Sequence, residues 1–366
     1  EKGSNETFFV HTTLIPYMYG SGELKTKPTQ NSVRDLRNMG IRADALVCRC
    51  PYATPVSIKE KLALFCSIKK ENIIDAVDVK NIYQIPLNLY EQKIDEIILK
   101  QFDMPIKKSN IKYLKDLVYT TEHLEKEVSV ALVGKYIELH DAYLSVSEAL
   151  KHAGYKYSTK VNIKWIDSES LENSTSSLDE IFKDVKGIIV PGGFGSRGIE
   201  GKIKAIKYAR ENNIAFLGLC LGMQLAIIEF ARNVCKLPDA NSTEFNPLCE
   251  NKIIDLMINQ KAIVNMGGTL RLGNYECSLK KGTLAYKAYN CDKILERHRH
   301  RYEFNNDYTD LIGSKGMVIS GVNDTSNLVE IIEIPNHKHF IACQFHPEFK
   351  SRPHPLFDSF IKATIE

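Results

Sequence analysis

The most constraining feature of the sequence is a cysteine placed between a predicted strand and a predicted helix. Residues 214–219 form a short apolar run typical of a buried parallel strand, and residues 221–231 repeat apolar side chains at helical spacing. Cys220 therefore lies at a strand-to-helix turn, flanked by Gly218 and Gly222. This is the cysteine counterpart of the Gly-x-Ser-x-Gly elbow, whose glycines permit a tight, strained turn that exposes the nucleophile. The N-terminus of the helix would favour the thiolate form of the cysteine.

A second segment supplies the base that such a nucleophile needs. Residues 340–345 read as another buried strand, which is followed by His346 and Glu348. Residues two apart at a strand end can share one side of the sheet, so Glu348 can orient His346 while His346 faces Cys220. A lone buried cysteine is usually inert, and a lone histidine is usually a satisfied polar group. The two motifs together favour nucleophilic catalysis.

Composition sets the broad class of the protein. The chain has 366 residues, 43% of them hydrophobic and 25% charged, which is typical of a globular protein with two domains. The net charge of +3 neither supports nor excludes nucleotide substrates, because a local cluster of Lys and Arg can hold phosphates. Nine cysteines show no disulfide framework, and no apolar run approaches the roughly 20 residues of a membrane helix. We therefore expect a cytoplasmic protein that does not bind membranes.

The order of strand and helix patterns predicts two domains. A charged stretch at residues 120–127 separates two ordered patterns. Before it, the sequence predicts a helix over 31–39, a strand over 43–47 and a mostly helical region over 79–119. After it, we expect a strand over 128–133, a helix over 142–152, a strand over 160–166, a Ser-rich loop over 168–177 and a strand over 187–190. Strands that alternate with helices indicate α/β domains with parallel, doubly wound sheets, here residues 1–123 and 124–366.

These motifs resemble a known family. Cys220 in Gly-Leu-Cys-Leu-Gly-Met-Gln, with His346-Pro-Glu348, resembles the triad-type class I glutamine amidotransferases, which hydrolyse glutamine through a thioester and pass ammonia to a partner domain. Further segments resemble the CTP synthase family in the same order, namely residues 25–30, 191–195, 241–245, 267–273 and 297–302. The resemblance implies a ligase of pyrimidine biosynthesis that uses ATP and glutamine-derived ammonia to convert UTP to CTP.

The resemblance also assigns roles to individual residues. The catalytic residues would be Cys220, His346 and Glu348. The glutamine site would contain Gly193, Leu221, Gly222, Met223, Gln224, Glu244 and Arg301. UTP, or CTP as inhibitor, would bind Lys25, Thr26, Lys27, Pro28, Thr29, Gln30 and Lys61. ATP would face Arg49, Val77, Asp78 and Val79. Without the resemblance, Arg49 and Lys61 would be interpreted as solvated surface residues.

Two basic or glycine-rich segments allow other interpretations. Residues 191–195 contain three glycines that can present backbone amides to an anion, and with the amide of Leu221 we expect them to form an oxyanion hole. The resemblance implies that Gly193 is the contributing glycine. A phosphate-binding loop is the alternative, but the Lys-Ser/Thr end of a Walker motif is absent. Residues 297–301 could be an RNA-binding patch or a His-x-His metal site, but no Lys/Arg-rich tract and no ligand at metal spacing supports either. We expect no nucleic-acid partner and no metal site in this chain.

The sequence departs from the family in one respect. The family uses Mg²⁺ with ATP, is activated by GTP at a lid that residues 266–273 resemble, and forms homotetramers and filaments. No Gly-x-x-x-x-Gly-Lys-Ser/Thr occurs here, and the family's Mg²⁺-binding acids near its N-terminus are missing. We therefore expect the C-terminal part of the synthetase domain, truncated at its N-terminus, plus a whole glutaminase domain that retains only glutamine hydrolysis.

Two other functions remain as alternatives. One is an amidotransferase or hydrolase with another acceptor, against which the UTP-site motif at residues 25–30 argues. The other is a non-catalytic role in assembly, against which the intact catalytic motifs argue.

Overall fold

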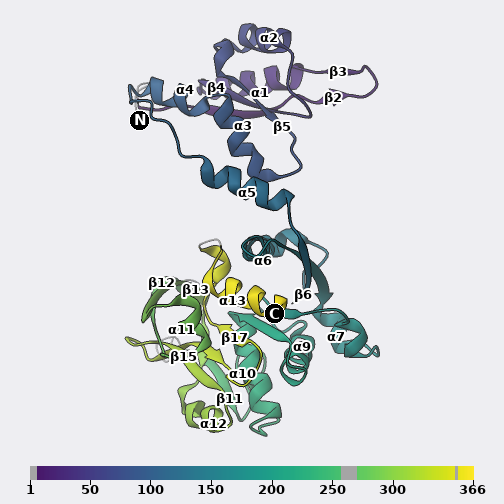
Figure 1. The fold of residues 1–366 in the computed structure, drawn as a ribbon, viewed down its shortest axis with the longest axis vertical. Coiled ribbons are helices and arrows are strands. Elements are labelled where there is room, and N and C mark those ends of the chain that lie inside the picture. Colours follow the sequence, from purple (N-terminus) through teal and green to yellow (C-terminus); the bar gives the residue numbers. More distant parts are fainter. Residues whose placement is uncertain (1–5, 257–269, 351–352) are drawn as a thin grey trace. The chain divides into compact units, whose positions relative to one another are not determined.

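The computed structural model describes residues 6–256, 270–350 and 353–366 of the chain. The chain divides into two compact units, Glu1–His123 (unit 1) and Leu124–Glu366 (unit 2), whose strands and helices are labelled in Figure 1. Both units combine helices with parallel strands, so the predicted α/β class is confirmed.

Unit 1 is built on a parallel sheet with the strand order β1-β4-β5. The strands are β1 (Val10–Leu14), β4 (Ala45–Cys50) and β5 (Ile73–Val77), and a small hairpin joins β2 (Tyr17–Met18) to β3 (Glu23–Leu24). The helices are α1 (Lys27–Asn38), α2 (Val56–Cys66), α3 (Ile85–Glu91), α4 (Ile94–Gln101) and α5 (Lys112–Glu122), with 3-10 turns η1 (Lys70–Asn72) and η2 (Ile82–Gln84). The apolar side of the sheet packs on α1 and α2 through Leu46, Val33 and Leu62.

Unit 1 differs from the sequence prediction at its helix ends. Helix α1 begins at Lys27 rather than at residue 31, because Pro28 suits the first turn of a helix. The region 79–119 holds three helices with a break at residues 102–111. Helix α5 continues to Glu122 and β6 begins at Lys126, so only residues 123–125 connect the two units.

Unit 2 contains a nine-stranded sheet of order β13-β12-β15-β16-β17-β9-β8-β6-β7. The parallel part comprises β6 (Lys126–Gly134), β7 (Thr159–Asp167), β8 (Gly187–Val190), β9 (Ala215–Leu219) and β17 (Phe340–Cys343). The antiparallel part comprises β12 (Arg271–Leu279), β13 (Lys293–His300), β15 (Val318–Asn323) and β16 (Leu328–Glu333). A small separate sheet joins β10 (Asn241–Ser242), β11 (Lys252–Leu256) and β14 (Tyr302–Phe304). The parallel prediction holds for five strands and misses the antiparallel extension.

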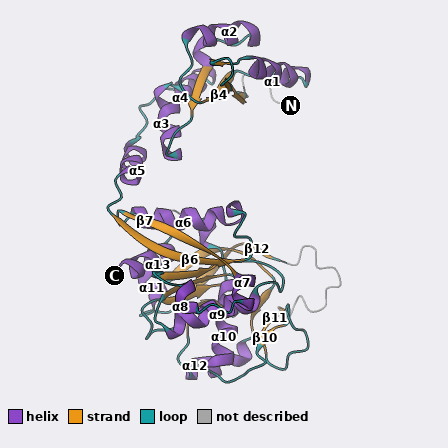
Figure 2. Cartoon of the chain, turned by 90° about the vertical axis from the view of Figure 1, so that its right-hand side faces the viewer, coloured by secondary structure: helices purple, strands orange, loops and turns teal. Residues whose placement is uncertain are grey.

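Helices cover both faces of this sheet, as Figure 2 shows. One face packs against α7 (Ser168–Asn173), α9 (Ile199–Glu211) and α10 (Leu221–Asn233). The other packs against α6 (Leu144–Tyr155), α11 (Leu284–Tyr289) and α13 (Pro355–Ile365). The other elements of unit 2 among the described residues are the short helices α8 (Leu178–Ile181) and α12 (Thr309–Ser314) and the 3-10 turns η3 (His140–Tyr143), η5 (Asn306–Tyr308) and η6 (Pro347–Phe349). Ile188 and Ile189 of β8 belong to opposite cores, as the two-residue period of a strand requires.

The predicted Ser-rich loop at residues 168–177 is wrong in its first half. Residues Ser168–Asn173 form α7, whose first turn is capped by the Asp167 side chain, which accepts a hydrogen bond from Ser170 N at 2.9 Å. A carboxylate at this position satisfies an amide that the helix itself leaves unpaired.

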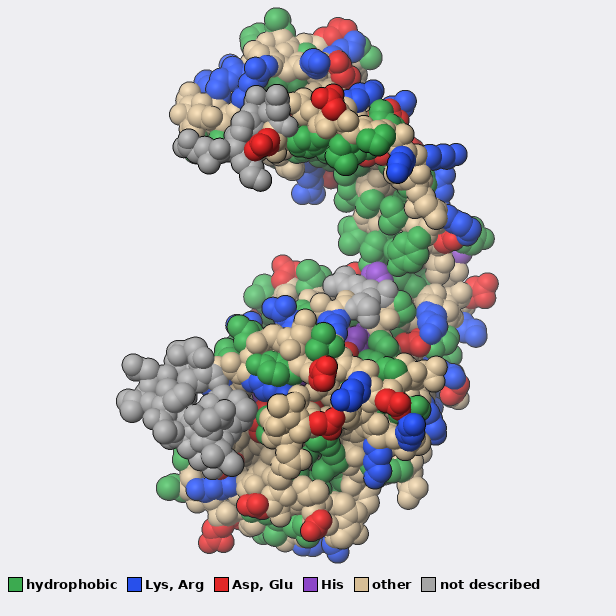
Figure 3. All heavy atoms as spheres, turned by 90° about the vertical axis from the view of Figure 1, so that its left-hand side faces the viewer, with side chains coloured by type: hydrophobic (Ala, Val, Ile, Leu, Met, Phe, Trp, Pro, Cys, Tyr) green, Lys and Arg blue, Asp and Glu red, His purple; other side chains and the backbone are tan. Residues whose placement is uncertain are grey.

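The described surface gives two general observations. On the face of unit 2 drawn in Figure 3, Lys and Arg side chains are interspersed with Asp and Glu. Among the described residues, no helix combines the length and the hydropathy that crossing a bilayer requires.

The buried His339 makes the stability of unit 2 depend on pH. Its Nδ1 lies 3.2 Å from Phe216 O and its Nε2 lies 3.1 Å from Ser359 Oγ. Burial lowers the pKa of His339 to about 4, below the value near 6.5 of an unfolded histidine. The unfolded state therefore binds more protons between these values, and the free energy of unfolding should fall by about 3 kcal/mol as the pH drops from 7 to 4.

We predict that His339→Gln removes this part of the pH dependence, measured as the free energy of unfolding in urea from pH 7 to pH 4. His123→Gln at the exposed end of α5 is the control and should keep the wild-type slope. Equal slopes for wild type and His339→Gln would contradict the assignment.

Candidate active site

Cys220 occupies a strained backbone position between β9 and α10. Its φ is +50° and its ψ is −101°, a conformation that costs a non-glycine residue about 1–3 kcal/mol. The flanking glycines make the turn possible by close packing. A Cβ at Gly222 would lie 2.1 Å from Val190 O, and one at Gly218 would lie 2.8 Å from the Ala342 Cβ. Cys220 N also donates a hydrogen bond to Cys343 O at 2.7 Å, which ties the elbow to the end of β17.

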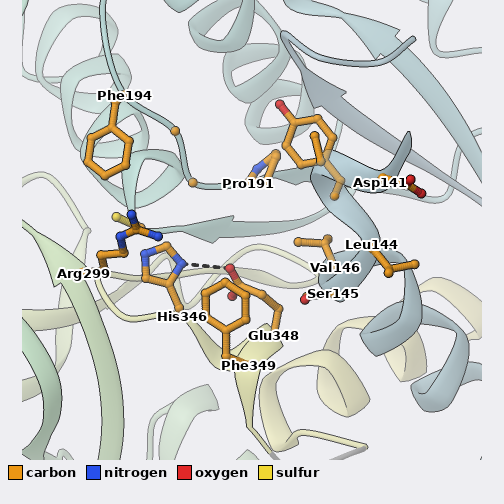
Figure 4. Close-up of a pocket in the computed structure, with 15 residues that line it drawn as sticks. Asp141, Leu144, Ser145, Val146, Pro191, Phe194, Arg299, His346, Glu348 and Phe349 are labelled. Carbon is orange, nitrogen blue, oxygen red and sulfur yellow. Dashed lines mark hydrogen bonds and ion pairs between the residues drawn. The ribbon is translucent and has the colours of Figure 1, made fainter. Parts of the chain in front are cut away.

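His346 and Glu348 form a buried pair just after β17. His346 Nδ1 donates to Glu348 Oε1 at 2.8 Å, drawn as a dashed line in Figure 4. The two residues do not lie on the end of the strand, as the sequence predicted, because β17 ends at Cys343. Instead, the 3-10 turn η6 brings the Glu348 carboxylate back to the His346 imidazole. The backbone of His346 is fixed by a hydrogen bond from its N–H to Arg297 O at 2.8 Å.

Cys220, His346 and Glu348 line one cavity of about 260 Å³. Its wall also includes Arg299, Phe194 and Phe349 (Figure 4). The Phe349 ring stacks on the imidazole at a centroid distance of 5.5 Å. Burial alone would lower the pKa of His346, but the Cys220 sulfur and the Glu348 carboxylate together raise that pKa to about 10. The surroundings therefore favour the imidazolium form of His346.

The glycine loop after β8 lies against both reacting side chains. A Cβ at Gly192 would lie 2.9 Å from His346 Cε1 and 3.5 Å from Cys220 Cβ, so only glycine fits without displacing the imidazole. A Cβ at Gly193 would lie 3.5 Å from Leu221 Cδ2 and 3.7 Å from Lys202 Nζ. Burial and the charge of Lys135 lower the pKa of the Lys202 ammonium to about 8. Gly192 was predicted only as part of the glycine loop, and the position of Lys202 was not predicted.

A second, small cavity of about 30 Å³ adjoins Cys220 and gathers the residues expected to bind glutamine. Four of them line it, namely Gly193, Gln224, Glu244 and Arg301. Leu221, Gly222 and Met223 do not line it, since they form the buried first turn of α10. Tyr302 and His300 complete the wall and were missed by the sequence argument.

The Glu244 carboxyl group lines this cavity. Its Oε1 accepts a hydrogen bond from Gly195 N at 3.1 Å. Burial raises the pKa of Glu244, while that hydrogen bond and the charges of Arg301 and Lys135 oppose the increase. A carboxylate and a guanidinium on one wall suit a ligand that carries both an ammonium and a carboxylate group.

The buried Gln344 side chain forms hydrogen bonds with both Cys220 and Gln224 but lines neither cavity. Gln344 Nε2 donates to Cys220 Sγ at 3.7 Å, and Gln344 Oε1 accepts from Gln224 Nε2 at 3.2 Å. Gln224 Nε2 also donates to Tyr302 O at 2.9 Å. Gln344 was not predicted, although a fully buried amide at the end of an apolar strand is itself a signal.

The predicted UTP residues of unit 1 surround a larger cavity of about 730 Å³. Lys25, Thr26, Lys27, Gln30 and Lys61 line it. Pro28 and Thr29 do not line this cavity. Pro28 lies in the first turn of α1. The Thr29 side chain is buried, and its Oγ1 donates a hydrogen bond to Leu14 O at 2.9 Å. Three ammonium groups around one cavity provide the charges that a triphosphate needs.

The predicted ATP residues lie at the carboxyl ends of neighbouring strands. Cys50 of β4 pairs with Val77 of β5, and Asp78 N donates to Cys50 O at 2.9 Å. Arg49 Nε donates to Asp78 Oδ1 at 3.1 Å, so these two side chains neutralise each other on the surface. Val79 is the next residue after Asp78 in the chain. Ligands of α/β sheets bind at such strand ends.

Two expectations concern metals and the lid. Among the described residues, no group of three or more His, Cys, Asp or Glu side chains could hold a metal ion. Residues 266–269 of the predicted lid lie outside the described part of the chain, and residues 271–273 begin β12.

Comparisons with known proteins find related families for both units. Residues 138–363 match the family described as Glutamine amidotransferase class-I, and residues 1–104 match the family described as CTP synthase N-terminus. A solved glutaminase domain of the CTP synthase from Trypanosoma brucei, with bound acivicin, is 39% identical with a TM-score of 0.60 and covers 65% of this chain and 94% of that domain.

Whole-chain relatives are more similar still. The chain is 54% identical to the CTP synthase of Caldanaerobacter subterraneus subsp. tengcongensis and 50% identical to that of Staphylococcus aureus. Each match covers 100% of this chain and 68% of the relative. The chain therefore belongs to the CTP synthase family, with a class I glutamine amidotransferase domain in its second unit.

Proposed function

We propose that unit 2 hydrolyses glutamine with Cys220 as nucleophile, His346 as general acid and base, and Glu348 as the group that orients His346. The observation that carries the proposal is the position of all three in one cavity, with the nucleophile on a strained elbow and the imidazole bound to its carboxylate at 2.8 Å. The membership of the chain in the CTP synthase family supports the same chemistry.

The first half of the reaction forms a thioester. The Cys220 thiolate attacks the side-chain carboxamide carbon of glutamine, and backbone amides at Gly193 and Leu221 stabilise the oxyanion. The raised pKa of His346 keeps its imidazolium ready to protonate the departing nitrogen, which leaves as ammonia. Glu244 and Arg301 hold the α-ammonium and α-carboxylate groups of the substrate.

The second half regenerates the enzyme. His346, neutral after giving up its proton, removes a proton from water while the water oxygen attacks the thioester carbon. The C–S bond breaks, glutamate leaves and the imidazolium–thiolate pair re-forms. A side chain at position 192 would displace the imidazole, because a Cβ there would lie 2.9 Å from His346 Cε1.

Unit 1 would contribute the nucleotide half of CTP synthesis. We propose that residues 1–123 belong to the synthetase domain, and that Lys25, Lys27 and Lys61 bind the phosphates of UTP or CTP in the 730 Å³ cavity. We place ATP near Arg49, Val77, Asp78 and Val79. In the complete reaction ATP phosphorylates the 4-oxygen of UTP, and ammonia then displaces the phosphate.

Not every group expected from the family fits the described residues. Among the described residues, no cluster of three or more His, Cys, Asp or Glu side chains could hold Mg²⁺. GTP activation, a homotetramer, filaments and a cytoplasmic location stay proposals. Because no Walker motif occurs in the 366 residues, we propose that this chain hydrolyses glutamine but does not make CTP when ATP and UTP are added.

The catalytic residues can be tested by measuring glutamate release from glutamine, with and without GTP. We predict that Cys220→Ala abolishes release, and that His346→Ala lowers the rate by about 10²–10⁴. Cys291→Ala, at the exposed free cysteine, is the matched control and should retain full activity. Normal activity of Cys220→Ala would refute the proposed nucleophile.

The pH profile tests the His346–Glu348 pair. Because the Cys220 sulfur and the Glu348 carboxylate together raise the pKa of His346, the imidazolium of the free wild-type chain persists to about pH 10. Removing the Glu348 charge in Glu348→Gln should move the alkaline limb of kcat/KM down by about 1–3 pH units. An unchanged limb would show that Glu348 does not control the protonation of His346.

The UTP cavity can be tested by calorimetry with UTP. Lys61→Ala should weaken binding by about 10- to 100-fold, because one charge-assisted contact contributes about 1.5–3 kcal/mol. Lys70→Ala, at an exposed lysine paired with Glu60 outside the cavity, is the control. Equal affinities of the two variants would argue against the assignment of Lys61.

A further inference from the structure

A buried carboxylate outside the catalytic cavity gathers a second set of polar side chains. Glu296 lies on β13 and is only 3% exposed. Tyr289 donates its hydroxyl hydrogen to Glu296 Oε1 at 3.0 Å, and His354 Nε2 lies 3.2 Å from the same oxygen. The Lys350 ammonium lies 3.4 Å from Glu296 Oε2. Glu296 is not among the residues that line the cavity around Cys220.

The protonation states of these partners follow from their contacts. His354 Nδ1 accepts a hydrogen bond from Leu356 N at 3.2 Å, so the ring proton is on Nε2 and is donated to Glu296. Burial and the Glu296 charge raise the pKa of the Tyr289 hydroxyl well above its ordinary value, which keeps it a donor. Tyr289 and His354 therefore donate to Glu296 Oε1, while the Lys350 ammonium forms an ion pair with Oε2.

Other groups that face Glu296 carry no charge of their own. The thiols of Cys277 on β12 and Cys343 on β17 both have raised pKa values, first because they are buried and further because of Glu296 among other acids. Lys350 is thus the cation that balances Glu296.

These contacts hold the segment that carries the proposed catalytic pair. This catalytic segment comprises residues 346–350. At its start, His346 N donates to Arg297 O at 2.8 Å. At its end, Lys350 Nζ donates to Leu295 O and pairs with Glu296. The two ends are fixed to three consecutive residues of one strand, and Glu348 lies between them. His354, beyond the segment, is held by the same carboxylate.

We propose that Glu296 is a positioning residue for glutamine hydrolysis, which acts by locking the catalytic segment against β13 so that His346 keeps its alignment with Glu348 and Cys220. The inference rests on the glutaminase function proposed above. Its physical basis is that the buried carboxylate holds two hydrogen-bond donors, Tyr289 and His354, and one ion-pair partner, Lys350. Loss of the carboxylate would leave the two buried donors unpaired in the interior. A displacement of about 1 Å at a reacting group can cost about 10²-fold in rate.

Glu296→Gln tests the role with little change of shape. Its amide oxygen can still accept hydrogen bonds from Tyr289 and His354. Its NH₂ group, however, faces the Lys350 ammonium, and two donors cannot form a hydrogen bond with each other. We predict that kcat for glutamine hydrolysis falls at least about tenfold while KM is unchanged, because the glutamine cavity is untouched. The alkaline limb of kcat/KM should also move to lower pH, because a looser contact with Glu348 raises the pKa of His346 less.

Two further variants separate positioning from general stability. Lys350→Met removes only the partly exposed ammonium, and it should shift kcat and the alkaline limb in the same direction by a smaller amount. Glu229→Gln is the matched control, because Glu229 is equally buried, is paired with Arg210 at 2.7 Å and lies on α10 behind the elbow. It should reduce the melting temperature and leave both kinetic readouts at wild-type values.

The outcomes distinguish the two proposals. If the wild-type chain releases glutamate, and if Glu296→Gln and Lys350→Met both keep the wild-type kcat and pH profile, the positioning role is wrong and the glutaminase proposal stands. If Glu296→Gln does not fold, Lys350→Met decides by the same readouts. If the wild-type chain releases no glutamate under any condition, the proposed function fails, and the role of Glu296 fails with it.

Discussion

The active site depends on one strained residue that the surrounding fold must keep in place. Cys220 has a positive φ because β9 must end and α10 must begin within a single residue. The helix can approach the sheet this closely because Gly222 packs against Val190 O and Gly218 against Ala342. About 1–3 kcal/mol of backbone strain is thus offset by burial in the two cores on either side of the sheet. A side chain larger than hydrogen at either glycine would push the helix away and release the turn.

The second requirement is a charge pair kept in an apolar surrounding. Burial disfavours a charged His346, yet the nearby Cys220 sulfur and Glu348 carboxylate more than reverse that effect on its pKa. Such a pair is useful only if its geometry is fixed, because charges in a low-dielectric interior are costly when separated. The hydrogen bonds of His346 N to Arg297 O and of Cys220 N to Cys343 O fix the two partners through the backbone. The Glu296 cluster extends the same support one layer outward.

The sequence predicted the parts of the structure whose side chains follow simple patterns. The parallel strand β9, the elbow and the helix α10 were predictable because apolar period and glycine spacing agree there. The antiparallel strand β13 was not, because its buried face carries Glu296, His298 and His300 in place of apolar residues. From sequence alone, such a row of charged and polar residues is interpreted as a surface patch. The buried partners come from other strands: Glu330 of β16 pairs with His298 and with Arg271 of β12. Gln344 and Lys202 were not predicted for the same reason, because their burial depends on contacts with residues distant in sequence.

We propose that glutamine is hydrolysed through a thioester on Cys220. The most direct measurement is to mix the chain with glutamine, stop the reaction with acid after a short time, and locate any glutamyl adduct by peptide mass spectrometry. The account predicts an adduct on the peptide that contains Cys220, and more of it in His346→Ala under conditions where acylation still occurs, because water attack then lacks its base. Glutamate release with an adduct on a different residue, or with no adduct at any time point, would contradict the account.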